Sequence, residues 1–334
     1  MQNSARINAK ITSVGHYVPD FVIDNKFFEG ILDTSDEWIT ERTGIKERRW
    51  LTADKPTSFM AEKAIKQVLE NRGIGPEDID MIIVGTVTPD MIYPSTACLL
   101  QEKIGAKNIW GFDILAACSG FIFALINGVQ FIQSGNFKKV LVVGADKMSA
   151  ILNIQDRNSA ILFGDAAGAV LLEPEEDKNE GILDWIMNID GSGAKNLFQL
   201  GGGSLHPASH QTVDDRMHFV YQEGRTVFKD AVKGMADVSY DILEENNLKG
   251  KDVAWLVPHQ ANHRIITATA ERMGLSMDKV MVNINKYGNT TAGTIPTCIS
   301  EYWQAGKVNK GDYLVLSSFG AGYTWGSVLL KWSY

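Results

Sequence analysis

One cysteine stands at the junction between an apolar stretch typical of a strand and one typical of a buried helix. Residues 112–117, FDILAA, indicate the strand, and residues 118–135, CSGFIFALINGVQFIQSG, indicate a helix that is apolar on almost every side. In the first turn of that helix, Cys118 would meet unpaired backbone N–H groups and the positive end of the helix dipole, which lower the pKa of a thiol. The segment alone leaves two interpretations open, an activated nucleophile and the small buried apolar residue that a free cysteine usually is.

The other two cysteines, Cys98 and Cys298, lie in amphipathic patterns without a helix start. We predict that both face a core and are structural. Three cysteines without a CxxC spacing favour neither a disulfide framework nor a zinc site.

A histidine follows a second apolar strand in AWLVPHQANHRI. His259 should emerge at the carboxyl end of that strand, where sites of open α/β sheets lie. HQANH resembles the HExxH zinc motif, but Gln260 cannot act as the general base, and His259 should precede the helix that contains His263, so we predict no metal. A hydrogen-bonded histidine at a strand edge is the alternative, and it is the interpretation we adopt for His16, His206, His210 and His218.

Two glycine-containing segments carry the remaining candidate site residues. In YGNTTAGTIP, residues 287–296, glycines on both sides of Asn289 indicate a tight loop that could hold the amide near His259, although Asn is also common as a capping residue. In SSFGAGYTWGS, residues 317–327, Gly320 and Gly322 permit close backbone approach and N–H groups that could form an oxyanion hole.

The length and composition are those of an ordinary globular protein with one large domain or two smaller ones. Its 334 residues are 45% apolar, and a net charge of −8 argues against general nucleic-acid binding. Apolar runs that are too short to cross a membrane, and a polar N-terminus, predict a cytoplasmic protein without membrane association. Strand-like runs alternate with helical segments, which predicts α/β layers; the runs are residues 79–87, 138–146, 167–173, 252–258 and 312–318.

A faint internal repeat predicts two similar halves. IIVGTVTPD corresponds to AWLVPHQAN, and KKVLVVGADK corresponds to GDYLVLSSFGAG. The charged stretch at 173–181 suggests a boundary, so we predict one half over residues 1–175 with Cys118 and another over 176–334 with His259 and Asn289.

Together these segments resemble the β-ketoacyl-acyl-carrier-protein synthase III family, condensing enzymes of fatty-acid initiation. The resemblance runs from DTSDEWITERTGIKERR (33–49) through AACSG, DRNSAILFGDAAGAVLL and VPHQANHRII to YGNTTAGTIP and FGAGYTWGS. It implies an α/β thiolase-like fold, with the two halves in five layers, αβαβα. It also implies a decarboxylating Claisen condensation of a short acyl-CoA primer with malonyl-acyl carrier protein, and no cofactor or metal beyond the coenzyme A thioesters.

The resemblance implies a triad of Cys118, His259 and Asn289. Cys118 would carry the acyl group, while His259 and Asn289 would stabilise the negative thioester oxygen that forms when malonyl loses CO₂, a task for which a carboxylate would be unsuitable. The oxyanion hole would pair the backbone N–H groups of Cys118 and Ala321, a position at which the family often has glycine.

Further contacts are implied by the same resemblance. Tyr93, where relatives often have phenylalanine, would close the acyl pocket of a partner subunit in a homodimer. Coenzyme A would contact Trp38, Arg42, Arg157, Phe228 and Asn262, and the acyl carrier protein would dock on Arg264, Lys229 and Arg272, beside the acidic Glu271.

Other functions are less compatible with the residues. A thiolase would need a second cysteine where Ser318 and Phe319 stand, elongating synthases have histidine in place of Asn289, and papain-like proteases carry a CGSCW-like signature that is absent. A related thiolase-fold starter synthase and a non-catalytic acyl-binding protein remain as alternatives.

Overall fold

Two mixed β-sheets form the frame of the computed structural model, which describes residues 7–334. The first sheet has the order β1-β7-β6-β4-β5, and the second has the order β11-β12-β13-β8. The strands of the first sheet are β1 (Asn8–Tyr17), β7 (Asp165–Glu175), β6 (Val140–Lys147), β4 (Met81–Gly85) and β5 (Trp110–Ile114). Those of the second are β11 (Trp255–Pro258), β12 (Tyr313–Gly320), β13 (Thr324–Lys331) and β8 (Gly181–Ile189).

Four strands of the first sheet have the same topology as the four of the second, which confirms the predicted repeat, while β5 is an additional edge strand. From β4 outward, β6 is parallel and β7 and β1 follow antiparallel; from β11 outward, β12 is parallel and β13 and β8 follow antiparallel. The chain order also corresponds, since β1, β4, β6 and β7 match β8, β11, β12 and β13. The chain passes from the first sheet to the second between β7 and β8. The predicted boundary between the two halves, at residues 175 and 176, stays a prediction.

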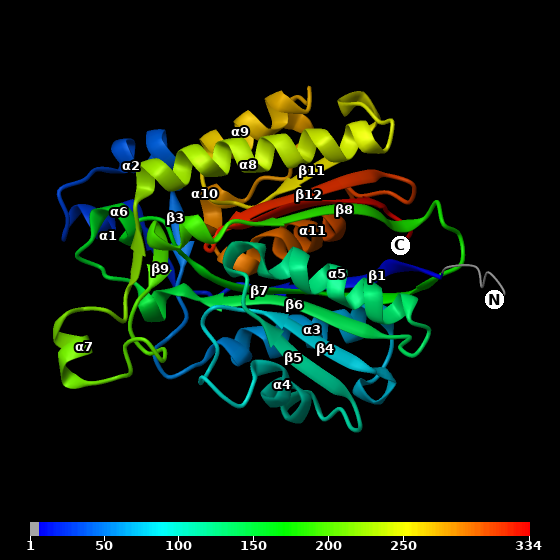
Figure 1. Cartoon of the computed structure of the whole chain (residues 1–334), viewed down its shortest axis with the longest axis horizontal. Coiled ribbons are helices and arrows are strands. Elements are labelled where there is room, and N and C mark those ends of the chain that lie inside the picture. Colours follow the sequence, from blue (N-terminus) through cyan, green and yellow to red (C-terminus); the bar gives the residue numbers. More distant parts are fainter. Residues whose placement is uncertain (1–6) are drawn as a thin grey trace.

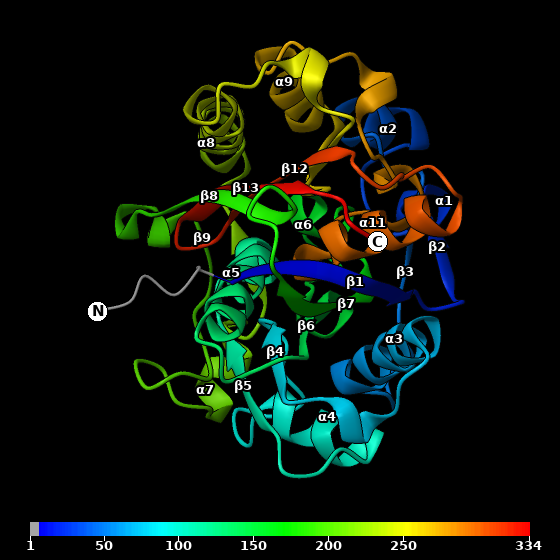
Figure 2. The ribbon, with the colours of Figure 1, turned by 90° about the vertical axis from the view of Figure 1, so that its right-hand side faces the viewer.

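Helices and sheets alternate in five layers, as expected (Figures 1 and 2). α8 (Gly224–Glu245) and α9 (His263–Arg272) cover the outer face of the second sheet, and α3 (Thr57–Arg72) and α4 (Thr96–Ile104) cover that of the first. Between the sheets lie α5 (Gly120–Gln133) and α11 (Thr294–Gln304), whose apolar side chains share one core with both sheets. The site-bearing loops therefore begin the two central helices.

Shorter elements gather at one end of the layers (Figure 1). They are the hairpin-like pairs β2 (Val22–Asp24) with β3 (Glu47–Arg49) and β9 (Leu197–Gln199) with β10 (Val220–Gln222), and the helices α1 (Asn25–Glu29), α2 (Asp36–Thr43), α6 (Arg157–Ala160), α7 (His210–Asp214) and α10 (Ile284–Tyr287). Within residues 7–334, no helix has the length and apolar character needed to cross a membrane.

The prediction for Cys98 is wrong. Cys98 lies in the first turn of α4, where Ser95 caps the helix by accepting the Cys98 N–H, and its side chain is exposed rather than core-facing. The buried face of α4 is formed instead by Ala97, Leu100 and Ile104. Cys298 lies fully buried in α11, as predicted.

Gly144 allows the loop before α11 to contact the first sheet. A Cβ at Gly144 in β6 would collide with the carbonyl of Ala292, which follows Asn289 by three residues. The close backbone approach therefore requires glycine and sets the depth at which the Asn289 loop sits.

We predict that Gly144→Ala destabilises the protein by about 1–3 kcal/mol, because overpacking a dense core forces the backbone to shift. Denaturant unfolding measures this change. Gly191→Ala is the matched control, since nothing lies within 4 Å of its added Cβ. Equal stability of the two variants would contradict the packing argument.

Candidate active site

The three residues of the predicted triad line a single cavity of about 970 Å³. Cys118 comes from the first half of the chain, whereas His259 and Asn289 come from the second. Phe228 and Phe319 form part of the apolar wall, and Trp38 and Arg42 lie along the same cavity. The structure therefore brings together residues that are up to 171 positions apart, as 289 − 118 shows.

Cys118 lies in a short 3₁₀ turn, Ala117–Ser119, two residues before α5 begins. This turn runs directly into α5, so Cys118 lies at the start of the helical segment as expected, in a first turn that is 3₁₀ rather than α-helical. Ala117 adopts a φ of 47°, which is uncommon for a residue with a side chain and indicates local strain at the nucleophile. Ser318 Oγ donates to the Cys118 carbonyl at 2.8 Å, so β12 fixes this turn.

The glycine-rich segment approaches the nucleophile closely. A Cβ at Gly320 would lie 2.8 Å from the Cys118 nitrogen, so only glycine permits this contact. Ala321 has no positive φ and therefore tolerates its methyl group, but it is absent from the residues that line the cavity. Its N–H as the second oxyanion donor stays a prediction.

Burial makes the Cys118 thiol harder to ionise than an exposed cysteine. Burial, and secondarily the negative charge of Asp146, raise the pKa of Cys118 to about 12, and a hydrogen bond to the backbone offsets only part of this. The expected lowering of the thiol pKa is wrong, because the side chain is buried and desolvation is the largest cause of the shift.

Asp146, which the sequence reasoning missed, ties the Asn289 loop to the first sheet. It is fully buried, and its carboxylate accepts hydrogen bonds from several side chains and backbone N–H groups. The donors are Thr86 Oγ1, the Val87 and Thr88 N–H groups, Thr88 Oγ1, Thr291 Oγ1 and the Ala292 N–H. A carboxylate at the end of the apolar run VLVVGAD was the signal that could have found it.

His259 is a buried, neutral imidazole. It follows β11, and its backbone N–H donates to the Ser317 carbonyl at 2.7 Å. Its ring atom Nδ1 lies 2.8 Å from Thr294 Oγ1. Burial lowers the pKa of His259 to about 3. Its Nε2 makes no hydrogen bond to any described residue, so this atom is available to a ligand in the cavity.

Asn289 presents an amide N–H₂ group. Its backbone is held on both sides, since its N–H donates to the Leu162 carbonyl and its own carbonyl accepts from Gly164. Its Oδ1 accepts the Thr291 N–H at 2.9 Å, which leaves Nδ2 as a donor without a partner among residues 7–334. Thr291, with a φ of 48°, is a second strained position beside a predicted catalytic residue.

Two arginines lie close to the ring of Trp38 at the cavity. The Arg42 and Arg157 guanidinium carbons lie 4.7 Å and 4.9 Å from the Trp38 ring centroid. Arg157 is also held by the Asp33 carbonyl, at 2.9 Å. Indole and guanidinium planes of this kind can stack on a purine.

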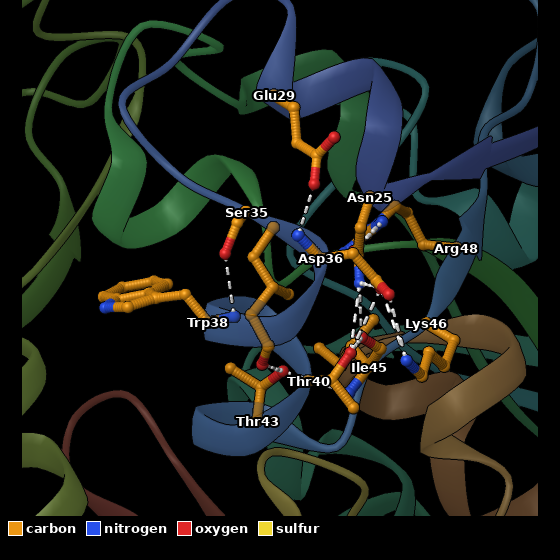
Figure 3. A network of polar contacts seen from close by, with 11 residues as sticks. Asn25, Glu29, Ser35, Asp36, Trp38, Thr40, Thr43, Ile45, Lys46 and Arg48 are labelled. Atoms are coloured by element: carbon orange, nitrogen blue, oxygen red, sulfur yellow. Dashed lines mark hydrogen bonds and ion pairs between the residues drawn. The ribbon is translucent and has the colours of Figure 1, made fainter.

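A polar network fixes the helix that carries Trp38 (Figure 3). Asn25 Nδ2 donates to Asp36 at 2.8 Å and to the Ile45 carbonyl at 2.9 Å, while Glu29 accepts the Asp36 N–H. The buried Arg48 donates to Asn25 Oδ1 at 2.9 Å. These contacts hold both ends of α2 and so fix the backbone from which the Trp38 side chain extends.

Asn262 and Phe228 connect the mouth of the cavity to α8 and α9. Asn262 caps α9 through the Arg264 N–H and donates to the Arg42 carbonyl at 2.9 Å. The Arg264 guanidinium lies 4.9 Å from the Phe228 ring centroid. The Asn262 amide is therefore already engaged in joining α9 to α2.

The predicted docking cations lie on the outer helices, and all three are exposed. Lys229 is on α8, and Arg264 and Arg272 are on α9. Arg272 lies 3.6 Å from Asp237, so its charge is partly balanced, whereas Lys229 has no ion pair among the described residues.

Sequence reasoning missed Arg216 and Arg225, which also line the cavity that contains Cys118.

Tyr93 does not line the Cys118 cavity of its own chain. It is 83% exposed and lies in a second cavity of about 980 Å³. Ile92 and Leu115 in the same cavity are 82% and 80% exposed.

Within residues 7–334, no cluster of three or more His, Cys, Asp or Glu side chains could hold a metal ion.

Comparisons with known proteins agree with this site. Residues 112–191 match the family model described as 3-oxoacyl-[acyl-carrier-protein (ACP)] synthase III, and residues 243–332 match its C-terminal counterpart. The β-ketoacyl-[acyl-carrier-protein] synthase III of Chlorobaculum tepidum is 57% identical over 98% of this chain and 100% of that protein. The corresponding protein of Koribacter versatilis is 51% identical, covering 98% of both chains.

Solved structures are similar over almost the whole chain. The 3-oxoacyl-[acyl-carrier-protein] synthase III of Aquifex aeolicus has a TM-score of 0.89 at 44% identity, covering 97% of this chain and 100% of that one. The β-ketoacyl synthase III of Thermus thermophilus has a TM-score of 0.90 at 40% identity, covering 97% and 99%. The chain therefore belongs to the β-ketoacyl-[acyl-carrier-protein] synthase III family.

Proposed function

We propose that this enzyme condenses a short acyl-CoA primer with malonyl-acyl carrier protein, releasing CO₂ and forming a β-ketoacyl-acyl carrier protein that initiates fatty-acid synthesis. The observation that carries the proposal is the shared cavity of Cys118, His259 and Asn289. Within it the triad supplies one thiol and two neutral polar side chains, the set that acyl transfer and enolate stabilisation require. Family membership supports the same reaction.

In the first half-reaction, the Cys118 sulfur attacks the acyl-CoA carbonyl. The bond from that carbonyl to the coenzyme A sulfur breaks, and the thiol proton leaves with coenzyme A as its thiol. Because burial keeps the thiol protonated, proton loss and attack must be coupled. The coenzyme would enter past Trp38 and Arg157, along a cavity whose mouth also carries Arg225.

In the second half-reaction, malonyl-acyl carrier protein loses CO₂ and its thioester oxygen becomes negative. The Asn289 Nδ2 group and the His259 Nε2 atom are the unpartnered polar groups of the triad that can face this oxygen. The enolate carbon then attacks the acyl-Cys118 carbonyl, the bond from that carbonyl to the Cys118 sulfur breaks, and the departing thiolate takes up a proton from solvent. Donors held in a buried site are strong because little solvent competes with them.

The alternative of a related starter synthase keeps the same chemistry. A priming β-ketosynthase of the R1128 polyketide pathway is 30% identical with a TM-score of 0.91, so the fold alone does not separate the two. The higher identity to synthase III proteins favours fatty-acid initiation. We also propose that the enzyme acts in the cytoplasm and requires no metal or further cofactor.

We predict that His259→Ala and Asn289→Ala each slow malonyl decarboxylation by on the order of 10²-fold or more, since each removes one donor to the enolate oxygen. Both variants should still form the acyl adduct on Cys118, which intact-mass analysis detects. Cys118→Ala is the control and should form none. Loss of the adduct in both the His259 and the Asn289 variants would contradict the division of roles.

We predict that the basic surface on α8 and α9 docks the acidic carrier protein. Lys229→Glu should raise the KM for malonyl-acyl carrier protein while leaving the KM for acyl-CoA unchanged, because Lys229 is exposed and outside the cavity. The effect should weaken as salt is added. Arg264→Glu should act in the same direction, although Arg264 also lines the cavity.

Lys103→Glu on α4 changes the same charge in the opposite outer layer and serves as the control for Lys229→Glu. If both variants raise the carrier-protein KM equally, the effect belongs to net charge rather than to docking.

We further propose a homodimer in which Tyr93 closes the acyl pocket of the partner subunit. The exposed Ile92, Tyr93 and Leu115 support it, since neighbouring apolar side chains at this exposure usually mark an interface. Sedimentation should give a dimer for the wild type and a monomer for Leu115→Asp, while Phe21→Asp, at another exposed apolar residue, stays dimeric. A monomeric wild type at micromolar concentration would contradict this assembly.

A further inference from the structure

Thr294 lies directly beside the imidazole of His259. It is the first residue of α11, it is 1% exposed, and its Oγ1 is 2.8 Å from His259 Nδ1. None of the other described side chains hydrogen-bonds to this imidazole. Thr294 therefore controls what Nδ1 can do.

The Thr294 hydroxyl proton has two possible acceptors. Besides His259 Nδ1, the Thr291 carbonyl lies 2.9 Å from Oγ1. The Thr291 carbonyl also receives the backbone N–H of Thr294. Because this carbonyl keeps a donor in either case, the hydroxyl proton is free to point at the imidazole.

The choice of acceptor decides which nitrogen of His259 carries the proton. A neutral imidazole has one N–H and one lone pair, so the hydrogen bond made by one nitrogen fixes the role of the other. If the hydroxyl donates to Nδ1, the proton of the ring must be on Nε2. Nε2 is the atom without a partner among the described residues, and its ring lines the cavity with Cys118 and Asn289.

We infer that Thr294 is a positioning residue that donates its hydroxyl proton to His259 Nδ1 and so keeps the imidazole proton on Nε2, aimed at the malonyl thioester oxygen. This inference rests on the proposed condensation. It explains how a buried histidine can donate to a developing anion without being charged beforehand. Two neutral donors, His259 Nε2 and Asn289 Nδ2, then meet the same oxygen.

Variants of Thr294 test the role kinetically. Thr294→Val preserves the shape and removes the hydroxyl, and it should slow malonyl decarboxylation about 3- to 10-fold, the value of one hydrogen bond, while acylation of Cys118 keeps its rate. Thr294→Ser should restore decarboxylation. Thr297→Val is the matched control, because Thr297 is one turn further along α11, equally buried, and its hydroxyl has no partner among the described residues.

Nitrogen-15 NMR of the labelled imidazole tests the tautomer directly in the unmodified enzyme. We expect a protonated Nε2 and an unprotonated Nδ1 for His259, assigned by its loss in His259→Ala. A protonated Nδ1 in the wild type would overturn the inference, as would a Thr294→Val variant that slows neither half-reaction or both equally. Failure of the proposed function itself is separate, since wild-type enzyme would then form no acyl-Cys118 or no β-ketoacyl product.

Discussion

The buried carboxylate of Asp146 is the constraint on which the geometry of the site depends. It ends β6 in the first sheet and accepts hydrogen bonds from the loop after β4 and from Thr291 and Ala292, which follow Asn289. A buried carboxylate is tolerated only when such donors replace water. One side chain of the first half thus fixes the loop that carries Asn289 in the second half.

The charge of the Asp146 carboxylate also affects the ionisation of Cys118. It lies near enough to Cys118 to raise the pKa of the thiol further above the value that burial alone would give. The other two members of the triad, His259 and Asn289, are uncharged. A site of this kind favours neutral thioesters entering the first half-reaction and reserves its donors for the negative oxygen that appears in the second.

Much of this arrangement was predictable because it depends on local patterns. The apolar strand just before His259, the strand and helix on either side of Cys118, and the glycines around Asn289 are each visible in consecutive residues of the sequence. The similarity of AWLVPHQAN and IIVGTVTPD predicted that the two halves correspond. In the structure these segments form β11 and β4, respectively, together with the loops that follow them. The position of Cys98 was mispredicted because Ser95 begins α4 just before it, a capping signal that was overlooked.

What could not be predicted are contacts between distant segments. The bond of Ser318 to the Cys118 carbonyl, the donors to Asp146 and the contact of Thr294 with His259 each join residues 35 or more positions apart. The thiol pKa was mispredicted for the same reason. A helix dipole is visible in the sequence, whereas the depth of burial and a nearby charge follow only from the packing of both halves.

The most direct test of this account is the pH dependence of Cys118 alkylation by iodoacetamide, measured in a Cys98→Ser background because Cys98 is exposed and would also react. Only the thiolate reacts, so the rate reports the ionisation of the sulfur. The account predicts a rate that keeps rising with pH beyond about 8.5, the ordinary pKa of a cysteine. A rate that already levels off near neutral pH would show a preformed thiolate and contradict the buried, protonated nucleophile.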